Sequence, residues 1–97
     1  MRDSQAGGTA CFLIDRSLPG ITLGQLAALR QAVHVACRRL SADGQSIRYL
    51  GSTFLPAQSR CLCLFEAADK GVVVMANETA QAPFSRVDEA LGFSAPA

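Results

Sequence analysis

The sequence predicts one α+β domain whose elements follow the order strand–helix–strand–strand–helix–strand. Three observations lead to this prediction. A chain of 97 residues holds one modest core. A long amphipathic pattern begins at Leu23, and two apolar runs at 46–56 and 61–67 flank a short turn. The order is that of ferredoxin-like domains, in which a four-stranded antiparallel sheet carries both helices on one face.

The first strand is expected at 11–16, a short apolar run, and a helix follows it. Thr22 and Gln25 have the spacing of a capping box, and Gly44 is well placed to end the helix. Between them, apolar residues recur at steps of three and four, as an amphipathic helix requires. These residues are Leu26, Leu29, Val33, Ala36, Cys37 and Leu40.

The segment 46–67 is rich in aliphatic, aromatic and β-branched residues and predicts an antiparallel hairpin with its turn at 57–60. Both of its strands are apolar at most positions on both faces. Antiparallel strands with one wet face normally alternate, so something must cover the second face. Gly51 lies inside the first strand and indicates a bulge or the close approach of another group.

The segment 69–80 is ambiguous, because its valines have strand propensity while Asp69 is a good helix N-cap. We predict a helix, since a crossover must follow the third strand. The last strand is expected at 86–91 and is polar enough for a sheet edge. The domain then covers 11–93, between a flexible tail at 1–10 and a second tail at 94–97.

Composition excludes several classes of partner. A net charge of +1 and the absence of Trp argue against a nucleic-acid surface. No apolar run approaches ~20 residues, so no membrane segment is expected. The polar start of the chain lacks the pattern of a signal peptide, and we expect a cytoplasmic protein.

The four cysteines, Cys11, Cys37, Cys61 and Cys63, are expected to be free thiols. A Cys-x-Cys pair on a strand places both thiols on one face, which suits a disulfide poorly. A thiolate metal site would need Cys11 or Cys37 to converge on that pair. The simpler interpretation is that all four are small buried hydrophobic residues.

Because both helices cover one face of the predicted sheet, its other face is open in a monomer. The apolar character of the hairpin on both sides predicts that two sheets pack face to face in a homodimer. Such a dimeric α+β barrel encloses an interior with room for a small-molecule ligand.

The candidate site residues lie on the strands. Tyr49, Gly51 and Thr53 are expected to share one face, by the two-residue period of a strand. Asp15 and Glu66 end two central strands and are expected near each other or near Tyr49. Enclosure beside apolar walls would raise the pKa of Glu66, so Glu66 and Tyr49 are the candidates for proton transfer. Ion pairs with arginine and a weak all-oxygen metal site remain alternatives for the carboxylates.

The chain also resembles a small bacterial family of the nickel-binding-protein type, frequent in actinobacteria. The motifs that carry the resemblance keep their order and spacing over residues ~11 to ~92. They lie at 12–20, 48–53, 63–67 and 76–86. The resemblance implies a ferredoxin-like fold, a dimer and a nickel cofactor, and it supports a helix at 69–80.

The resemblance also implies where a nickel site would lie. Many members carry histidine at the position of Gly51 and again near Ala76 and Asn77, where this chain has no imidazole. By resemblance alone, Asn77 and Phe84 are expected to line the ligand-binding mouth. The single histidine, His34, is a general base, a metal ligand or simply a solvated helix residue, and its place beside the apolar stripe favours the last.

Three functions follow from these observations. The first is a homodimeric protein that binds a small ligand without the histidine metal site. The second is an enzyme of the dimeric α+β-barrel kind that moves a proton on a small substrate. The third is an interaction module whose sheet face serves only assembly.

Overall fold

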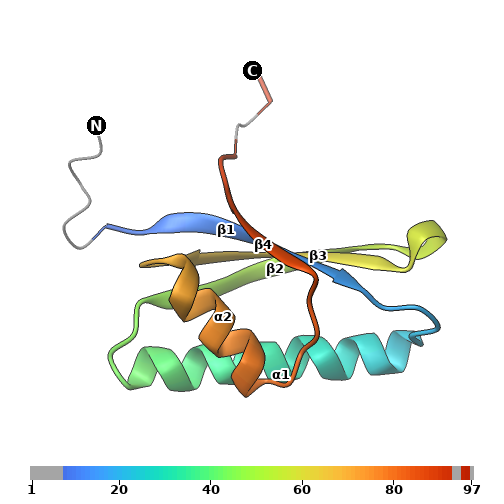
Figure 1. Cartoon of the computed structure of the whole chain (residues 1–97), viewed down its shortest axis with the longest axis horizontal. Helices are drawn as coiled ribbons and strands as arrows, with labels where there is room; N and C mark the ends of the chain where they lie inside the picture. Colours follow the sequence, from blue (N-terminus) through green and yellow to red (C-terminus); the bar gives the residue numbers. More distant parts are fainter. Residues whose placement is uncertain (1–7, 93–94, 97) are drawn as a thin grey trace.

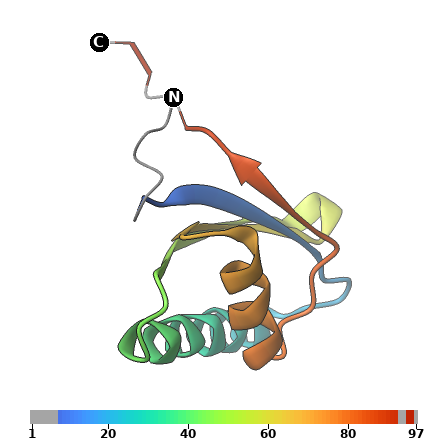
Figure 2. The same cartoon turned by 60° about the vertical axis from the view of Figure 1, so that its left-hand side comes forward.

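The computed structural model describes residues 8–92 and 95–96. Its strands form one antiparallel sheet in the order β2-β3-β1-β4. Both helices lie against the same face of this sheet (Figures 1 and 2). The predicted ferredoxin-like fold is therefore confirmed. The elements are β1 Ala10–Ser17, α1 Leu23–Ala42, β2 Ile47–Leu55, a 3-10 turn Pro56–Gln58, β3 Arg60–Ala67, α2 Lys70–Thr79 and β4 Arg86–Ala90.

Local signals set the ends of both helices. The Thr22 hydroxyl accepts from the Gln25 N–H, and the Gln25 side chain accepts from the Thr22 N–H, both at 3.0 Å. Past the end of α1, Gly44 adopts φ +98° while its N–H donates to Ser41, which closes the helix. The ambiguous segment begins as a helix because Asp69 Oδ1 accepts from the Val72 N–H at 3.0 Å.

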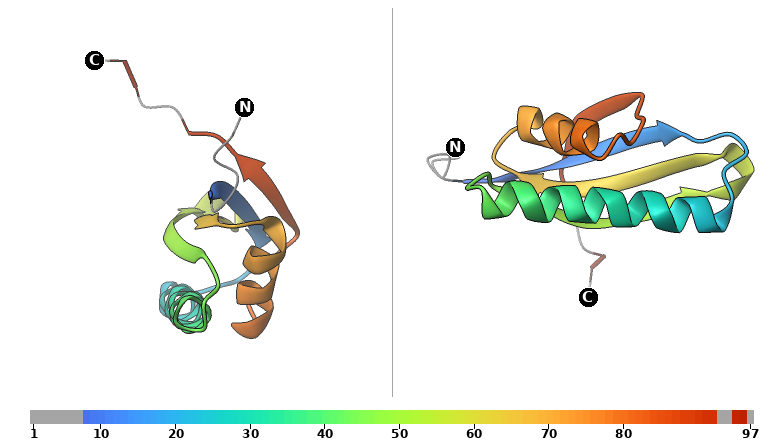
Figure 3. Two further views of the ribbon diagram at one scale, coloured as in Figure 1. Left: turned by 90° about the vertical axis from the view of Figure 1, so that its left-hand side faces the viewer. Right: turned by 90° about the horizontal axis from the view of Figure 1, so that it is seen from below.

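The core lies between the sheet and the helices. Along β3 burial alternates strictly, so that Cys61, Cys63, Phe65 and Ala67 face the helices. Their cross-strand partners on β1 include Phe12 and Ile14, which are also buried. The long α1 packs against β2, and the shorter α2 packs beside it against β3 and β4 (Figure 3). This helix-covered face holds the whole core of the described chain.

The opposite face of the sheet carries no element of the described chain (Figures 1 and 2). Leu62 and Leu64 of β3 and Leu13 of β1 are half-buried at its centre. This is the second apolar face that the hairpin sequence predicts. The homodimer expected to cover it stays a prediction.

A β-bulge in β2 reverses the predicted face of one residue. Tyr49 pairs with the buried Phe65, but Gly51 pairs with Leu64 of the open face, so Leu50 is the extra residue between them. Tyr49 therefore faces the helices, while Gly51 and Thr53 face the other way. The prediction that all three share one face is wrong, because the bulge breaks the two-residue period.

No helix in the described ranges is long and apolar enough to cross a bilayer. Ala10, predicted as part of the N-terminal tail, already belongs to β1. The rest of the tail at 1–10, apart from residues 8 and 9, lies outside the described residues. So do Phe93 at the predicted domain end and two positions of the tail at 94–97.

Candidate functional site

The pocket with the most varied set of functional groups lies between α1 and the bulge of β2. It has a volume of about 430 Å³ and combines a guanidinium, two hydroxyls, a thiol and apolar walls. We call it the bulge pocket. It is lined by Leu26, Arg30, Tyr49, Leu50, Gly51, Ser52, Phe54 and Cys61.

The β-bulge of β2 forms one wall of this pocket, and its backbone conformation requires a glycine at position 51. Gly51 adopts φ +147°, a conformation that residues with a Cβ rarely take. The Leu50 side chain is left 43% exposed as the unpaired residue. The sequence-based expectation of a bulge at Gly51 is confirmed. Its consequence is that Tyr49 and Ser52, three residues apart, meet on the helix-covered face.

Tyr49 anchors the polar part of the bulge pocket. Its ring packs against Phe65 with centroids 5.3 Å apart, and its hydroxyl is hydrogen-bonded to the Ser52 hydroxyl. Ser52 Oγ in turn donates to Cys63 Sγ at 3.0 Å. Burial raises the pKa of Tyr49, so its hydroxyl stays protonated near neutral pH. Tyr49 can hydrogen-bond a ligand there but is not a ready general base.

A second groove of about 410 Å³ continues from the bulge pocket along α1 and shares Arg30 and Tyr49 with it. His34, one helical turn after Arg30, lines this groove. Sequence reasoning left Arg30, Ser52 and Cys61 out of the site. The four-residue spacing of Arg30, His34 and Arg38 was the one signal that could have revealed a basic stripe.

The predicted carboxylates lie on the open face, away from Tyr49. Asp15 pairs in register with Leu62, and Glu66 lies four residues further along β3, roughly 13 Å away at ~3.3 Å per residue. The expectation that they lie near each other or near Tyr49 is wrong, and so is an all-oxygen site joining the three. Alternation places them on one face, and the antiparallel register separates them.

Each carboxylate is instead held by an arginine. Arg48 Nη2 lies 2.8 Å from Glu66 Oε1, and Arg60 Nη2 lies 2.8 Å from Asp15 Oδ2. The Arg48 hydrogen bond lowers the pKa of Glu66, and the Arg60 hydrogen bond lowers that of Asp15. The predicted raised pKa of Glu66 is therefore wrong, because an adjacent cation favours the carboxylate. Glu66 is not a poised proton donor in this chain.

Asn77 and Phe84 lie at neither the bulge pocket nor the open face. The Asn77 side chain is fully buried in α2, where Nδ2 donates to the Val73 carbonyl and Oδ1 accepts from Arg16 Nη2 at 2.6 Å. Phe84 packs partly buried against the core. Asn77 supports Arg16, an arginine with no exposed surface. The ligand-binding role expected for both residues stays a prediction.

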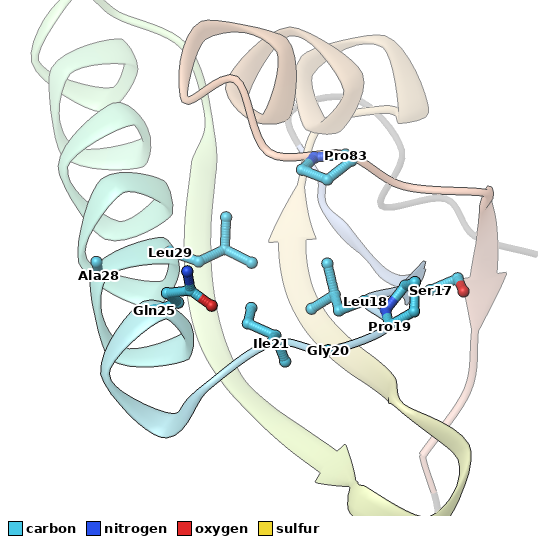
Figure 4. Close-up of a pocket in the computed structure, with 9 residues that line it drawn as sticks. All are labelled: Ser17, Leu18, Pro19, Gly20, Ile21, Gln25, Ala28, Leu29 and Pro83. Atoms are coloured by element: carbon cyan, nitrogen blue, oxygen red, sulfur yellow. The ribbon is translucent and has the colours of Figure 1, made fainter.

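A larger pocket, of about 730 Å³, lies where the loop after β1 enters α1 (Figure 4). The side chains of Leu18, Ile21 and Leu29 surround its space, and Pro83 closes one side (Figure 4). None of its lining residues is titratable. It offers apolar surface but no group for catalysis or for binding a charge.

Comparisons with known proteins assign the chain to a family. Residues 12–89 match the model of a family described as "Nickel responsive protein SCO4226-like". The chain belongs to this family. The crystal structure of SCO4226 from Streptomyces coelicolor A3(2) is similar, with a TM-score of 0.70 and 25% identity over 89% of this chain and all of that one. No curated protein matches. The predicted family resemblance is confirmed.

The residues of this chain do not fit a nickel site built within one subunit. The sequence contains one histidine, and among the described residues no three His, Cys, Asp or Glu side chains group so that they could hold a metal ion. Gly51 stands where the resemblance implies a histidine, and its φ of +147° disfavours any side chain there. Family membership therefore does not carry the nickel ligands with it.

Proposed function

We propose that this protein is a homodimer that binds a small organic anion in the bulge pocket. The observation that carries the proposal is the composition of that pocket. Arg30 supplies a positive charge, Tyr49 and Ser52 supply hydroxyls, and Leu26 and Phe54 supply an apolar wall. Small-molecule sites place a few convergent polar groups beside apolar walls in this way.

The charge of α1 favours an anion. The helix carries three arginines and His34 but no Asp or Glu. Within the described part of the chain, the ion pairs join Arg48, Arg60 and Arg86 to carboxylates and leave the α1 arginines without one. A guanidinium binds a carboxylate or phosphate through two parallel hydrogen bonds. A carboxylate with an apolar body fits Arg30 together with the Leu26 and Phe54 wall.

The open face of the sheet is the proposed dimer surface. Leu13, Leu62 and Leu64 form an apolar centre there. Ion pairs frame it at both ends, Arg48–Glu66 at one and Arg60–Asp15 at the other. A two-fold axis places the same surface on both subunits, which suits an apolar centre with charged rims. The bulge pocket lies on the other face and stays accessible in such a dimer.

Intrinsic fluorescence provides a direct test of the binding proposal. Tyr49 is the only tyrosine and the chain has no Trp, so tyrosine emission reports on the bulge pocket and on the groove that adjoins it along α1. Titration with small carboxylates and phosphates, beginning with benzoate, is expected to change this emission at saturable concentrations. Arg30→Ala should weaken the response at least tenfold, whereas Arg39→Ala, a matched loss of charge on α1 outside this pocket, should not. A panel without response, or equal effects of both variants, would overturn the proposal.

Light scattering coupled to size-exclusion chromatography tests the dimer. The native chain is expected at twice the mass of one subunit. Leu64→Glu places a charge at the centre of the open face and should give a folded monomer by circular dichroism. Leu23→Glu is the matched control, since Leu23 is 77% exposed at the start of α1, and it should remain dimeric. A monomeric native chain, or a dimeric Leu64→Glu variant, would contradict the assembly.

A further inference from the structure

Two thiols lie side by side beneath the bulge pocket. Cys61 and Cys63 occupy alternate positions of β3, so both face the helices, and their sulfur atoms are 3.8 Å apart. Both are buried and unoxidised, and Cys61 lines the bulge pocket. Neighbouring positions on one face suit a disulfide poorly but allow both sulfurs to bind one ion between them.

An unbalanced buried cation lies next to these thiols. Arg16 is directly opposite Cys61 in the β1–β3 register, and its side chain is 0% exposed. Its described hydrogen bonds go to neutral acceptors, the Pro83 carbonyl at 3.1 Å, the Ala82 carbonyl at 3.5 Å and Asn77 Oδ1 at 2.6 Å. Its Nε is buried without a partner.

The buried guanidinium of Arg16 therefore lacks a negatively charged partner among the described residues. Buried charges are normally paired, and the described residues provide Arg16 with no carboxylate. A thiolate at Cys61 would supply that charge from the neighbouring strand. Burial raises the pKa of Cys61 to about 11, and the positive charge of Arg16 acts against that rise, so the thiol gives up its proton only when a bound cation replaces it.

The second thiol also has a supporting partner. Ser52 Oγ donates to Cys63 Sγ at 3.0 Å, and a hydrogen bond from a hydroxyl stabilises a thiolate. Arg16 and Ser52 thus stand on opposite sides of the pair, because β1 and β2 flank β3. The open space of the bulge pocket provides a route to Cys61.

We propose that Cys61 and Cys63 form a two-thiolate site for a soft cation of low coordination number, with Cu(I) as the type. A linear two-coordinate ion with metal–sulfur bonds of ~2.3 Å needs its sulfurs about 4.6 Å apart, so binding requires Cys61 and Cys63, now 3.8 Å apart, to open by a little under 1 Å. Thiolates select soft ions. Zinc in structural sites takes four ligands, and the described residues group no third Cys, His, Asp or Glu there. Binding displaces the thiol protons to solvent and so strengthens as pH rises.

An anaerobic Cu(I) titration against a chromophoric chelator tests the site. The reduced protein is expected to bind one Cu(I) per chain in competition with the chelator. Cys61→Ala and Cys63→Ala should each weaken binding at least ~100-fold, beyond the effect of losing a supporting residue. A Cys11→Ser, Cys37→Ser variant is the matched control and should retain the ion. Cu(I) withheld by the Cys61→Ala variant, or none withheld by the native chain, would overturn the proposal.

Three further measurements complete the test: thiol alkylation, metal competition and Cu(I) binding by an Arg30→Ala variant. Alkylation of the native chain in moderate urea, where transient opening exposes the buried thiols, with and without Cu(I) and followed by peptide mapping, identifies the thiols that the ion protects even where an alanine variant fails to fold. Protection of any pair other than Cys61 and Cys63 refutes the site, as does preference for Zn(II) or Ni(II) over Cu(I). Arg30→Ala should leave Cu(I) binding unchanged, so failure of the anion proposal and failure of this one are distinguishable.

Discussion

Replacing Gly51 with alanine should destabilise the protein through the backbone alone. A Cβ built at Gly51 meets no atom within 4 Å, so the substitution creates no clash. The loss of stability comes from the φ of +147°, a conformation that is about 1–3 kcal/mol less favourable for an L residue with a Cβ. A loss of about 2 kcal/mol in the free energy of unfolding lowers the Tm of a domain this size by roughly 8–16 °C.

Urea denaturation followed by circular dichroism measures this change. Gly24→Ala is the matched control, since Gly24 lies in α1 with its nearest atom 3.9 Å from a built Cβ and no left-handed φ. It should stabilise the protein by about 0.5–1 kcal/mol, because alanine is the better helix residue. A Gly51→Ala variant within 0.5 kcal/mol of the native chain would refute the account of the bulge. Gly51→His should carry the same strain, and a fully stable His variant would refute it as well.

Three other predictions rest on single contacts. Asn77→Leu removes the Oδ1 acceptor of the buried Arg16 and should lower the free energy of unfolding by about 2 kcal/mol. Urea titration at pH 7 measures this loss, and a change below 0.5 kcal/mol would contradict the prediction. Asp15 has its pKa lowered by Arg60, so the stability it contributes is present above its unfolded pKa near 4 and is lost as pH falls toward the folded value. Unfolding free energies between pH 7 and pH 3 should therefore decline less in Asp15→Asn than in the native chain, and equal slopes would argue against the ion pair. Thr22→Ala removes the cap of α1 and should cost about 1 kcal/mol in thermal or urea unfolding, a result that an unchanged Tm would exclude.

Several residues that the sequence suggested for the site lie instead on the open face, which we propose as the dimer surface. Asp15, Thr53 and Glu66 all lie there, and Gly51 pairs with Leu64 at its centre. Its carboxylates are neutralised by arginines, which removes them as acids or bases near neutral pH. The chemistry of the chain is concentrated on the other face, between α1 and β2. Substitutions on the open face should therefore alter the oligomeric state more than ligand binding.

The sequence by itself determined the element order and the start of α1, because hydrophobic period and capping depend on neighbours within a few residues. The helix at 69–80 also needed the crossover that the order of the strands requires. Capping at Thr22 and Asp69 is such a local signal, and the two apolar faces of β3 are visible in its composition. Only the tertiary structure decided which face each site residue occupies. One extra residue at Leu50 moved Tyr49 away from Gly51, and register alone separated Asp15 from Glu66. The burial of Arg16 beside Cys61 joins β1 to β3 across 45 residues of chain, a distance over which no local pattern carries information.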